Sequence, residues 1–228
     1  MTDLHDVNTP FSLFNSSSKA LHSESAHYFP RFNYSACELW LCTEICHIIN
    51  AGEKGLQSLS GGKVFLYNED GKRDLTLYSS GETDAPVIEK HIEVKLIYPT
   101  DNSTFITSVN DLCRKLSQSL DATYCLEGWV YLVWTQHYAI SPDAFFETRL
   151  NRLTEAVNAR EYIGTSGIKY RPMFSMVKDI AEGCLTWRGE EKKIIVKAVA
   201  FSFHKEWKEI LKDVKRDYAK TFEILAKR

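Results

Sequence analysis

The sequence predicts an α/β fold in which helices flank a mixed central sheet, with a hairpin and a helix at the C-terminal end. Apolar residues recur at helical spacing in some segments and alternate in others, and the two kinds of segment follow one another along the chain. The chain has 228 residues, of which 44% are hydrophobic and 25% are charged. This composition is typical of a globular domain with a substantial core.

Residues 1–25 are polar and rich in Ser and Asn, which predicts a weakly ordered N-terminal extension. Residues 26–228 are predicted to form a single domain, with a core over about 35–135 and a C-terminal elaboration over 136–228. The first segment lacks the apolar stretch of a signal peptide, and no run reaches the ~18 apolar residues of a membrane span. We therefore expect a soluble cytoplasmic protein that has no membrane partner.

The first predicted element is a helix over about Ser35–Asn50, in which Leu39, Cys42 and Cys46 lie three or four residues apart. Three strands follow at about 63–67, 74–78 and 91–98, and a turn sequence joins the first two. These strands predict an antiparallel meander.

A helix is expected next, over about Thr104–Leu120, followed by the apolar run Trp129–Trp134, which is typical of a strand buried on both faces. Ser141 and Pro142 predict the N-cap and first residue of a helix that reaches about Ala159. The remaining predicted elements are a short helix at Met176–Glu182, a hairpin of Cys184–Arg188 and Lys193–Phe203, and a lysine-rich helix at Lys205–Lys227.

Neither the cysteines nor the net charge identifies a function. The six cysteines include no CxxC pair, so buried reduced thiols are preferred over a zinc site, although Cys42 and Cys46 share a helix face. The formal net charge is -2, which gives no global positive field for a nucleic-acid partner. A basic footprint can still be local, and acidic metal ligands lower the total.

Charged and apolar residues alternate on the second and third strands. Glu93 and Lys95 point away from the apolar residues that lie between them in the segment 91–96. Asp74 opens the second strand, on the opposite face from Leu75. If these strands pair, the side chains of Asp74, Glu93 and Lys95 converge on one side of the sheet.

Such a trio suits metal-dependent hydrolysis of a phosphodiester. Two carboxylates, from Asp74 and Glu93, supply hard oxygen ligands for Mg²⁺, which binds phosphate oxygens well and retains several waters. The bound ion lowers the pKa of a water ligand and neutralises charge on the phosphate. Lys95 can orient that water or help to deprotonate it. The alternative is that all three residues lie on the solvated face of an ordinary amphipathic strand.

Asp74 at the start of the second strand, Glu93-Val94-Lys95 on the third, and the helix and buried strand that follow resemble the PD-(D/E)xK nuclease superfamily. The resemblance covers about Ser35–Trp134 and implies a restriction-endonuclease-like core. It also implies a Mg²⁺-dependent DNA endonuclease of restriction type, with Mn²⁺ as a substitute ion and a homodimer as the assembly. One departure is that Arg73 stands where a proline often precedes the aspartate.

Many members of the superfamily also place a glutamate from the first helix near the metal. Glu38 and Glu44 are the candidates, and Glu38 is preferred because it lies at the edge of the buried helix face. Stabilisation of the helix dipole is the competing explanation for Glu38. His91 shares a face with Glu93, where it could hold a phosphate, but an ordinary strand histidine is the simpler interpretation.

Other cationic and aromatic residues are weaker candidates for contacts with nucleic acid. Lys115 and Gln118, on the helix that follows the third strand, could approach the scissile strand. The terminal lysines alternate with acidic residues, which is typical of a solvated helix face. Trp129, Trp134 and Trp207 are interpreted as core residues. Besides a nuclease, the sequence allows a non-catalytic binding or scaffold protein with the same fold, or an unrelated α/β domain.

Overall fold

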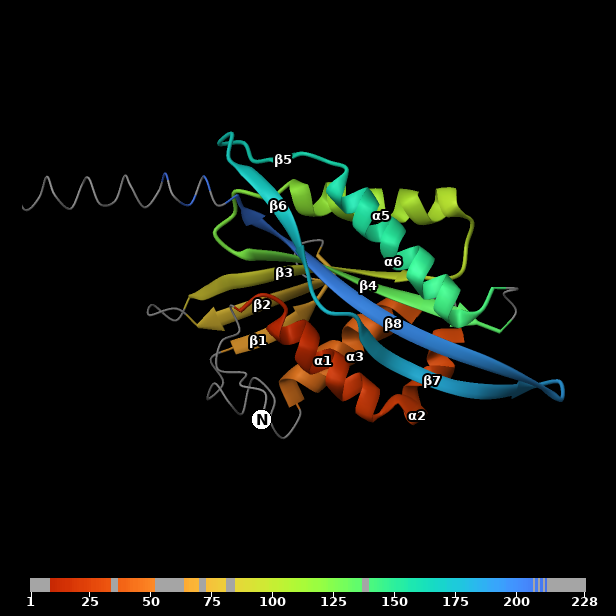
Figure 1. Ribbon diagram of the computed structural model, residues 1–228. Helices are drawn as coiled ribbons and strands as arrows, with labels where there is room; N and C mark the ends of the chain where they lie inside the picture. The colour runs from red at the N-terminus through yellow and green to blue at the C-terminus, as the bar shows by residue number, and fades with distance from the viewer. Residues whose placement is uncertain are drawn as a thin grey trace, which may run out of the picture.

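The computed structural model describes residues 9–33, 37–51, 64–69, 73–80, 85–136 and 140–206, together with Lys208, Ile210 and Lys212. These residues form three layers, with a mixed eight-stranded sheet between two layers of helices (Figure 1). The prediction of an α/β fold with a mixed sheet flanked by helices is confirmed. No described helix is long and apolar enough to cross a membrane.

The strand order of the sheet is β1-β2-β3-β4-β8-β6-β5, and β7 pairs with a second stretch of β8. Among the described strands, β3 and β4 run parallel and the other pairs are antiparallel. The strands are β1 (Val64–Asn68), β2 (Leu75–Ser80), β3 (Pro86–Ile97), β4 (Cys125–Thr135), β5 (Tyr162–Ile163), β6 (Lys169–Phe174), β7 (Lys178–Trp187) and β8 (Glu190–Lys205).

Each face of the sheet has its own helices and its own hydrophobic core. α1 and α3 pack on one face, and α5 and α6 pack on the other (Figure 1). The helices are α1 (Ser12–Ser23), α2 (Ser25–Tyr28), the 3-10 helix η1 (Phe29–Asn33), α3 (Cys37–Ala51), α5 (Asn102–Ser117) and α6 (Pro142–Asn158).

Most of the predicted central elements are confirmed. Leu66 pairs with Leu77, and Leu75 pairs with Ile92, so β1, β2 and β3 form the expected antiparallel meander. Residues 126–134 of β4 are buried throughout and alternate between the two cores, as a strand covered on both faces requires.

The starts of α5 and α6 follow from their N-caps. Ser141 Oγ accepts a hydrogen bond from the Ala144 amide, which confirms the predicted start of α6. α5 begins two residues before the predicted Thr104, because Asp101 Oδ1 accepts a hydrogen bond from the Thr104 amide at 2.8 Å and caps the helix there.

The expectation of a weakly ordered extension over residues 1–25 is wrong for its described part. Residues 12–23 form α1, and its side chains Leu13, Phe14 and Leu21 are fully buried in the core that α1 shares with α3. Phe14 and Leu21 lie seven residues apart, which is two helical turns, and the buried positions between them are Ser17 and Ser18, so the apolar pattern of this helix is weak in the sequence. Residues 1–8 lie outside the described residues.

The short helix predicted at Met176–Glu182 is also wrong, because Lys178 begins the ten-residue strand β7. This segment forms hydrogen-bonded pairs with β8, for example Ala181 with Val196. An apolar segment this short does not distinguish helix from strand, and the long-range hydrogen bonds decide. β5 and β6 were not expected. The terminal helix predicted from Lys205 begins later, because Lys205 is the last residue of β8. Lys208, Ile210 and Lys212 are helical, and the segment beyond Lys212 lies outside the described residues.

A fully buried ion pair joins β3 to β4 beneath α1. Lys90 Nζ lies 2.5 Å from Glu127 Oε1, and neither side chain has any exposed surface. The same carboxylate accepts hydrogen bonds from the Phe11 amide at 3.0 Å and from Trp129 Nε1 at 2.8 Å. Phe11 precedes α1 with a positive φ of 64°, so Glu127 also holds the strained entry to that helix.

Candidate functional site

The candidate site forms where β2 begins and β3 continues beyond it. The last pair between the two strands is Leu75 with Ile92, whereas β3 remains paired with β4 as far as Ile97. On its β2 side, β3 therefore presents unpaired backbone amides after Ile92. Two carboxylates accept from these amides: Asp74 Oδ2 from Val94 N at 2.8 Å, and Glu38 Oε2 from Leu96 N at 2.9 Å.

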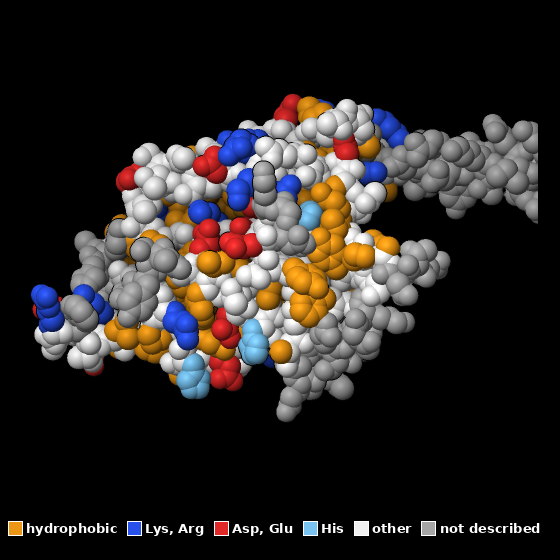
Figure 2. Space-filling model, turned by 180° about the vertical axis from the view of Figure 1, so that it is seen from behind, with side chains coloured by type: hydrophobic (Ala, Val, Ile, Leu, Met, Phe, Trp, Pro, Cys, Tyr) orange, Lys and Arg blue, Asp and Glu red, His pale blue; other side chains and the backbone are white. Residues whose placement is uncertain are grey.

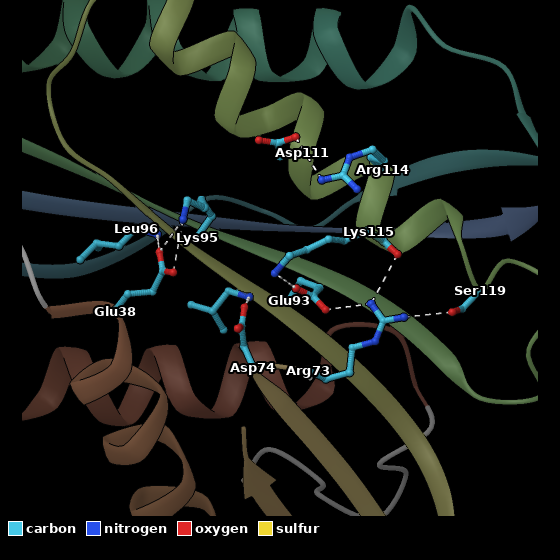
Figure 3. A network of polar contacts seen from close by, with 11 residues as sticks. Glu38, Arg73, Asp74, Glu93, Lys95, Leu96, Asp111, Arg114, Lys115 and Ser119 are labelled. Atoms are coloured by element: carbon cyan, nitrogen blue, oxygen red, sulfur yellow. Dashed lines mark hydrogen bonds and ion pairs between the residues drawn. The ribbon is translucent and has the colours of Figure 1, made fainter. Parts of the chain in front are cut away.

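Glu93 lies between them on β3, and its side chain points toward α5. Its carboxylate is 1% exposed, and a buried charge of this kind requires partners. Arg73 Nη1 donates to Oε1 at 2.8 Å, and Lys115 Nζ donates to Oε2 at 2.6 Å (Figure 3). Arg73 is fixed in turn by Ser119 Oγ at 3.0 Å. Both oxygens of Glu93 thus carry a cationic partner.

Lys95 follows on the same face of β3 and reaches the edge of the strand. Its Nζ lies 3.1 Å from Glu38 Oε2, and 38% of its side chain is exposed. Glu38 comes from the first turn of α3, so it links this helix to the amide of Leu96 and to the ammonium group of Lys95. Lys95 and Glu38 therefore form a partly exposed side of the cluster, whereas Glu93 is buried.

The carboxylates of Asp74, Glu93 and Glu38 interact electrostatically with one another and with the ammonium group of Lys115. Burial raises the pKa of Asp74; its hydrogen bond from Val94 lowers that pKa, and the negative charge of Glu93 raises it further. Burial by itself lowers the pKa of Lys115, but the hydrogen bond and charge of Glu93 outweigh burial and raise it. Burial and the charge of Glu93 therefore destabilise the negative charge of Asp74, whereas Glu93 stabilises the positive charge of Lys115.

The structure brings together the four residues that the sequence singled out. Figure 3 shows Glu38, Asp74, Glu93 and Lys95 in one polar cluster between α3 and α5. The alternative helix carboxylate, Glu44, lies elsewhere and accepts a hydrogen bond from Tyr28 Oη at 2.9 Å. The preference for Glu38 over Glu44 thus agrees with the positions of the two side chains.

The weaker candidates take different positions. Lys115 belongs to the cluster, whereas Gln118 is the C-cap of α5. His91 is buried, with Nδ1 2.8 Å from Thr76 Oγ1, and its ring contacts that of Tyr124. The tryptophans at 129 and 134 are core residues as predicted, and that at 207 lies outside the described residues.

The role of Arg73 was not predicted from the sequence, in which this residue only stands where a proline often precedes the aspartate. No sequence motif marks Arg73, because its role is the 2.8 Å contact between its Nη1 and the Oε1 of Glu93, twenty residues later. The Lys90–Glu127 pair was missed too. A lysine within a strand normally indicates an exposed position, and only the matching buried carboxylate on β4 reverses that expectation.

The donor atoms suit a hard divalent cation. Asp74, Glu93 and Glu38 offer carboxylate oxygens, and Mg²⁺ needs only one or two of them alongside water. Among the described residues, however, no three His, Cys, Asp or Glu side chains already surround a common point. Lys115 and Arg73 hold the oxygens of Glu93 instead. The oxygen donors match the ligand preference of Mg²⁺, and Glu93 would have to exchange Lys115 for the ion in order to act as a ligand.

Comparison with known proteins adds no family to these observations. No family model, no curated protein and no solved structure matches this chain. The cluster itself and the order of the elements that build it are therefore the features that bear on function.

Proposed function

We propose that this protein is a Mg²⁺-dependent phosphodiesterase that cleaves nucleic acid. The observation that carries the proposal is the convergence of Asp74, Glu93 and Lys95 at the point where β3 extends past β2. The order α3, β1, β2, β3, α5, β4 agrees with the order that the resemblance to PD-(D/E)xK nucleases implies. By that resemblance the substrate is DNA and the enzyme an endonuclease of restriction type.

In this proposal Asp74 and Glu93 hold the ion, and Glu38 assists from α3. When bound, Mg²⁺ lowers the pKa of a water ligand and offsets charge on the phosphate. Lys95 positions the attacking water, since its ammonium group lies at the exposed edge of the cluster. Arg73 stays on Glu93 and orients that carboxylate, while Lys115, which is 46% exposed, is the partner that can turn outward.

A second candidate is a non-catalytic binding or scaffold protein with the same architecture. The observation in its favour is that Arg73 and Lys115 already satisfy both oxygens of Glu93 without an ion. In that case Asp74 and Glu38 serve only to accept hydrogen bonds from the unpaired edge of β3.

Cleavage of plasmid DNA, single-stranded DNA and RNA, each with Mg²⁺, Mn²⁺ or EDTA, separates the two candidates. The nuclease proposal predicts metal-dependent cleavage that Asp74→Asn and Glu93→Gln abolish and that Lys95→Met slows by about 10²–10⁴-fold. Each variant must be purified in parallel with the wild type, so that a contaminating nuclease appears in all samples. No cleavage by the wild type, or full activity of Asp74→Asn, would show that the catalytic assignment is wrong.

Glu38 and Glu44 provide a matched pair for the helix carboxylate. Both lie on α3, but only Glu38 contacts the cluster. We expect Glu38→Gln to reduce the cleavage rate and Glu44→Gln to leave it unchanged. Equal effects of the two substitutions would remove Glu38 from the proposed site.

A further inference from the structure

Three aromatic side chains form a continuous surface on β1 and β2, which we term the aromatic face (Phe65, Tyr67 and Tyr78). The ring centroids of Phe65 and Tyr67 lie 4.5 Å apart, and those of Tyr67 and Tyr78 lie 5.7 Å apart. Tyr67 is 50% exposed although it sits in the middle of the group, and its two neighbours are partly exposed. A contiguous group of partly exposed rings is more informative than a single exposed apolar residue, because such groups often mark binding sites.

The aromatic face lies on the same side of the sheet as Glu93. Tyr67 pairs with Thr76, Thr76 pairs with His91, and cross-strand partners share a face. The hydrogen bond between the side chains of Thr76 and His91 confirms that these two point the same way. Tyr67, Thr76 and His91 thus form one row across the three strands. His91 and Glu93 are two residues apart on β3, so the row that contains Tyr67 lies about 7 Å along the strand from Glu93.

The helices on this side leave the aromatic face open. α5 and α6 cover β3, β4 and β8, and the core beneath them includes no described residue of β1 or β2. On the opposite face, by contrast, Leu66 and Leu77 are fully buried in the core that contains α3. β1 and β2 are thus covered on one side, and their other side presents the three rings.

Cationic groups lie at the candidate site, two to four residues along β3 from the row that contains Tyr67. Lys115 and Lys95 are 46% and 38% exposed and pair with Glu93 and Glu38, and Arg114 on α5 is 61% exposed and pairs with Asp111. The space-filling view from behind shows acidic and basic side chains gathered near the middle of the molecule, with hydrophobic side chains next to them (Figure 2). Basic groups beside exposed aromatic rings are the two components of sites for single-stranded nucleic acid.

We propose that the aromatic face stacks the unpaired bases of single-stranded nucleic acid and so delivers the adjoining phosphate to the candidate site. This inference rests on the proposed function, and it assigns unpaired strands as the substrate in place of the duplex that a restriction-type enzyme would cut. In a duplex, neighbouring base pairs cover the faces of each base, so the rings of Tyr67 and Tyr78 have nothing to stack on. With a formal net charge of -2, backbone attraction alone is weak, and stacking has to supply much of the binding.

Binding without metal tests the proposal independently of cleavage. The probes are fluorescein-labelled 20-nucleotide oligo(dT) and oligo(U) and a blunt 20-base-pair duplex, followed by anisotropy in EDTA at one fixed salt concentration. We expect the single strands to bind at least about tenfold more tightly than the duplex, and Tyr67→Ala to weaken single-strand binding by about tenfold. The two single-stranded probes separate DNA from RNA.

Two further variants control for the loss of a large side chain. Tyr67→Phe keeps the ring and should bind within about twofold of the wild type, because stacking needs the π face and not the hydroxyl. Met176→Ala removes another exposed apolar side chain, on the connection between β6 and β7, and should also have no effect. Equal thermal unfolding curves for all variants show that Tyr67→Ala remains folded.

The results distinguish failure of this inference from failure of the proposed nuclease. Single-strand binding that depends on Tyr67, in a protein that cleaves nothing, supports the aromatic face and refutes the nuclease. Metal-dependent cleavage with no effect of Tyr67→Ala on binding refutes the aromatic face alone. Equal affinity for duplex and single strand, or no binding to any probe, also overturns the inference.

Discussion

Breaking the buried ion pair between Lys90 and Glu127 should be one of the most destabilising changes available in this chain. Lys90→Met removes the ammonium group but retains an unbranched side chain of similar length. It leaves the Glu127 carboxylate with no exposed surface and no cation, although the Phe11 amide and Trp129 Nε1 still donate to it. Glu127→Gln leaves the opposite problem, an ammonium group buried without its carboxylate.

The expected magnitude follows from the complete burial of the pair. Removal of one partner from a buried ion pair lowers the free energy of unfolding by about 3–5 kcal/mol. The two remaining N–H donors stabilise Glu127, so Lys90→Met should lie near the lower end of this range. The double variant buries no charge, but the NH₂ group of Gln at position 127 takes the place of one acceptor oxygen, so the amide N–H groups and one of the two donors are left unsatisfied, at about 1–3 kcal/mol each. This loss is shared with Glu127→Gln alone. The double variant should therefore be more stable than the sum of the two single changes predicts.

Urea unfolding, followed by far-UV circular dichroism and extrapolated linearly, measures all four free energies of unfolding for the cycle. We expect a coupling of at least about 3 kcal/mol. As a control, Asp179→Asn breaks an exposed pair with Lys197 and should cost no more than about 1 kcal/mol. Additive effects of Lys90→Met and Glu127→Gln, or a cost for Lys90→Met as small as the control's, would refute the reasoning.

Three further predictions concern pH, packing and thiol reactivity. Burial lowers the pKa of His204, so the folded state binds this proton less readily than the unfolded state, and stability should be lost as pH falls below about 6.5. In wild type, His204 should contribute at most about 1.4 kcal/mol per pH unit to the fall in unfolding free energy between pH 7 and pH 5.5, and His204→Gln should remove this contribution. The same pH dependence in wild type and variant would contradict the lowered pKa of His204. Gly128→Ala places a methyl group 2.9 Å from Leu116 Cδ1 and Phe201 Cε1, and urea unfolding should show a loss of about 1–3 kcal/mol, whereas a neutral effect would mean that these side chains repack freely. Cys184 is the exposed thiol of six free cysteines and should be the one that reacts rapidly with a chromogenic disulfide in the folded protein; fast reaction of a second thiol would disagree with the structure.

The central part of the fold could be predicted because its elements have strong local patterns. Alternation on β3 correctly placed Glu93 and Lys95 on one face, and turn residues correctly predicted the meander. Ser141 and Pro142 marked the start of α6 because capping is a local interaction. The errors arose where local and long-range preferences differ. Residues 178–187 became a strand through pairing with β8, which periodicity over a short segment cannot show.

The sequence by itself determined which residues are available for chemistry at the candidate site. The alternating pattern on β3 and the aspartate at the start of β2 selected Asp74, Glu93 and Lys95, and helix position favoured Glu38 over Glu44. These are local properties, since side-chain direction in a strand or helix follows from residue spacing alone.

Only the tertiary structure decided what those residues contact. The extension of β3 past β2 brings Asp74 to the Val94 amide, and the packing of α5 places Lys115 on Glu93. Packing also buried Lys90 against Glu127 and left Tyr67 exposed beside the site. The burial of a charged side chain and the identity of its contacts depend on residues distant in sequence, and together they determine which charge form of the side chain is favoured. The alternation on β3 indicates where Glu93 points, but the fold alone determines that two cations meet it there.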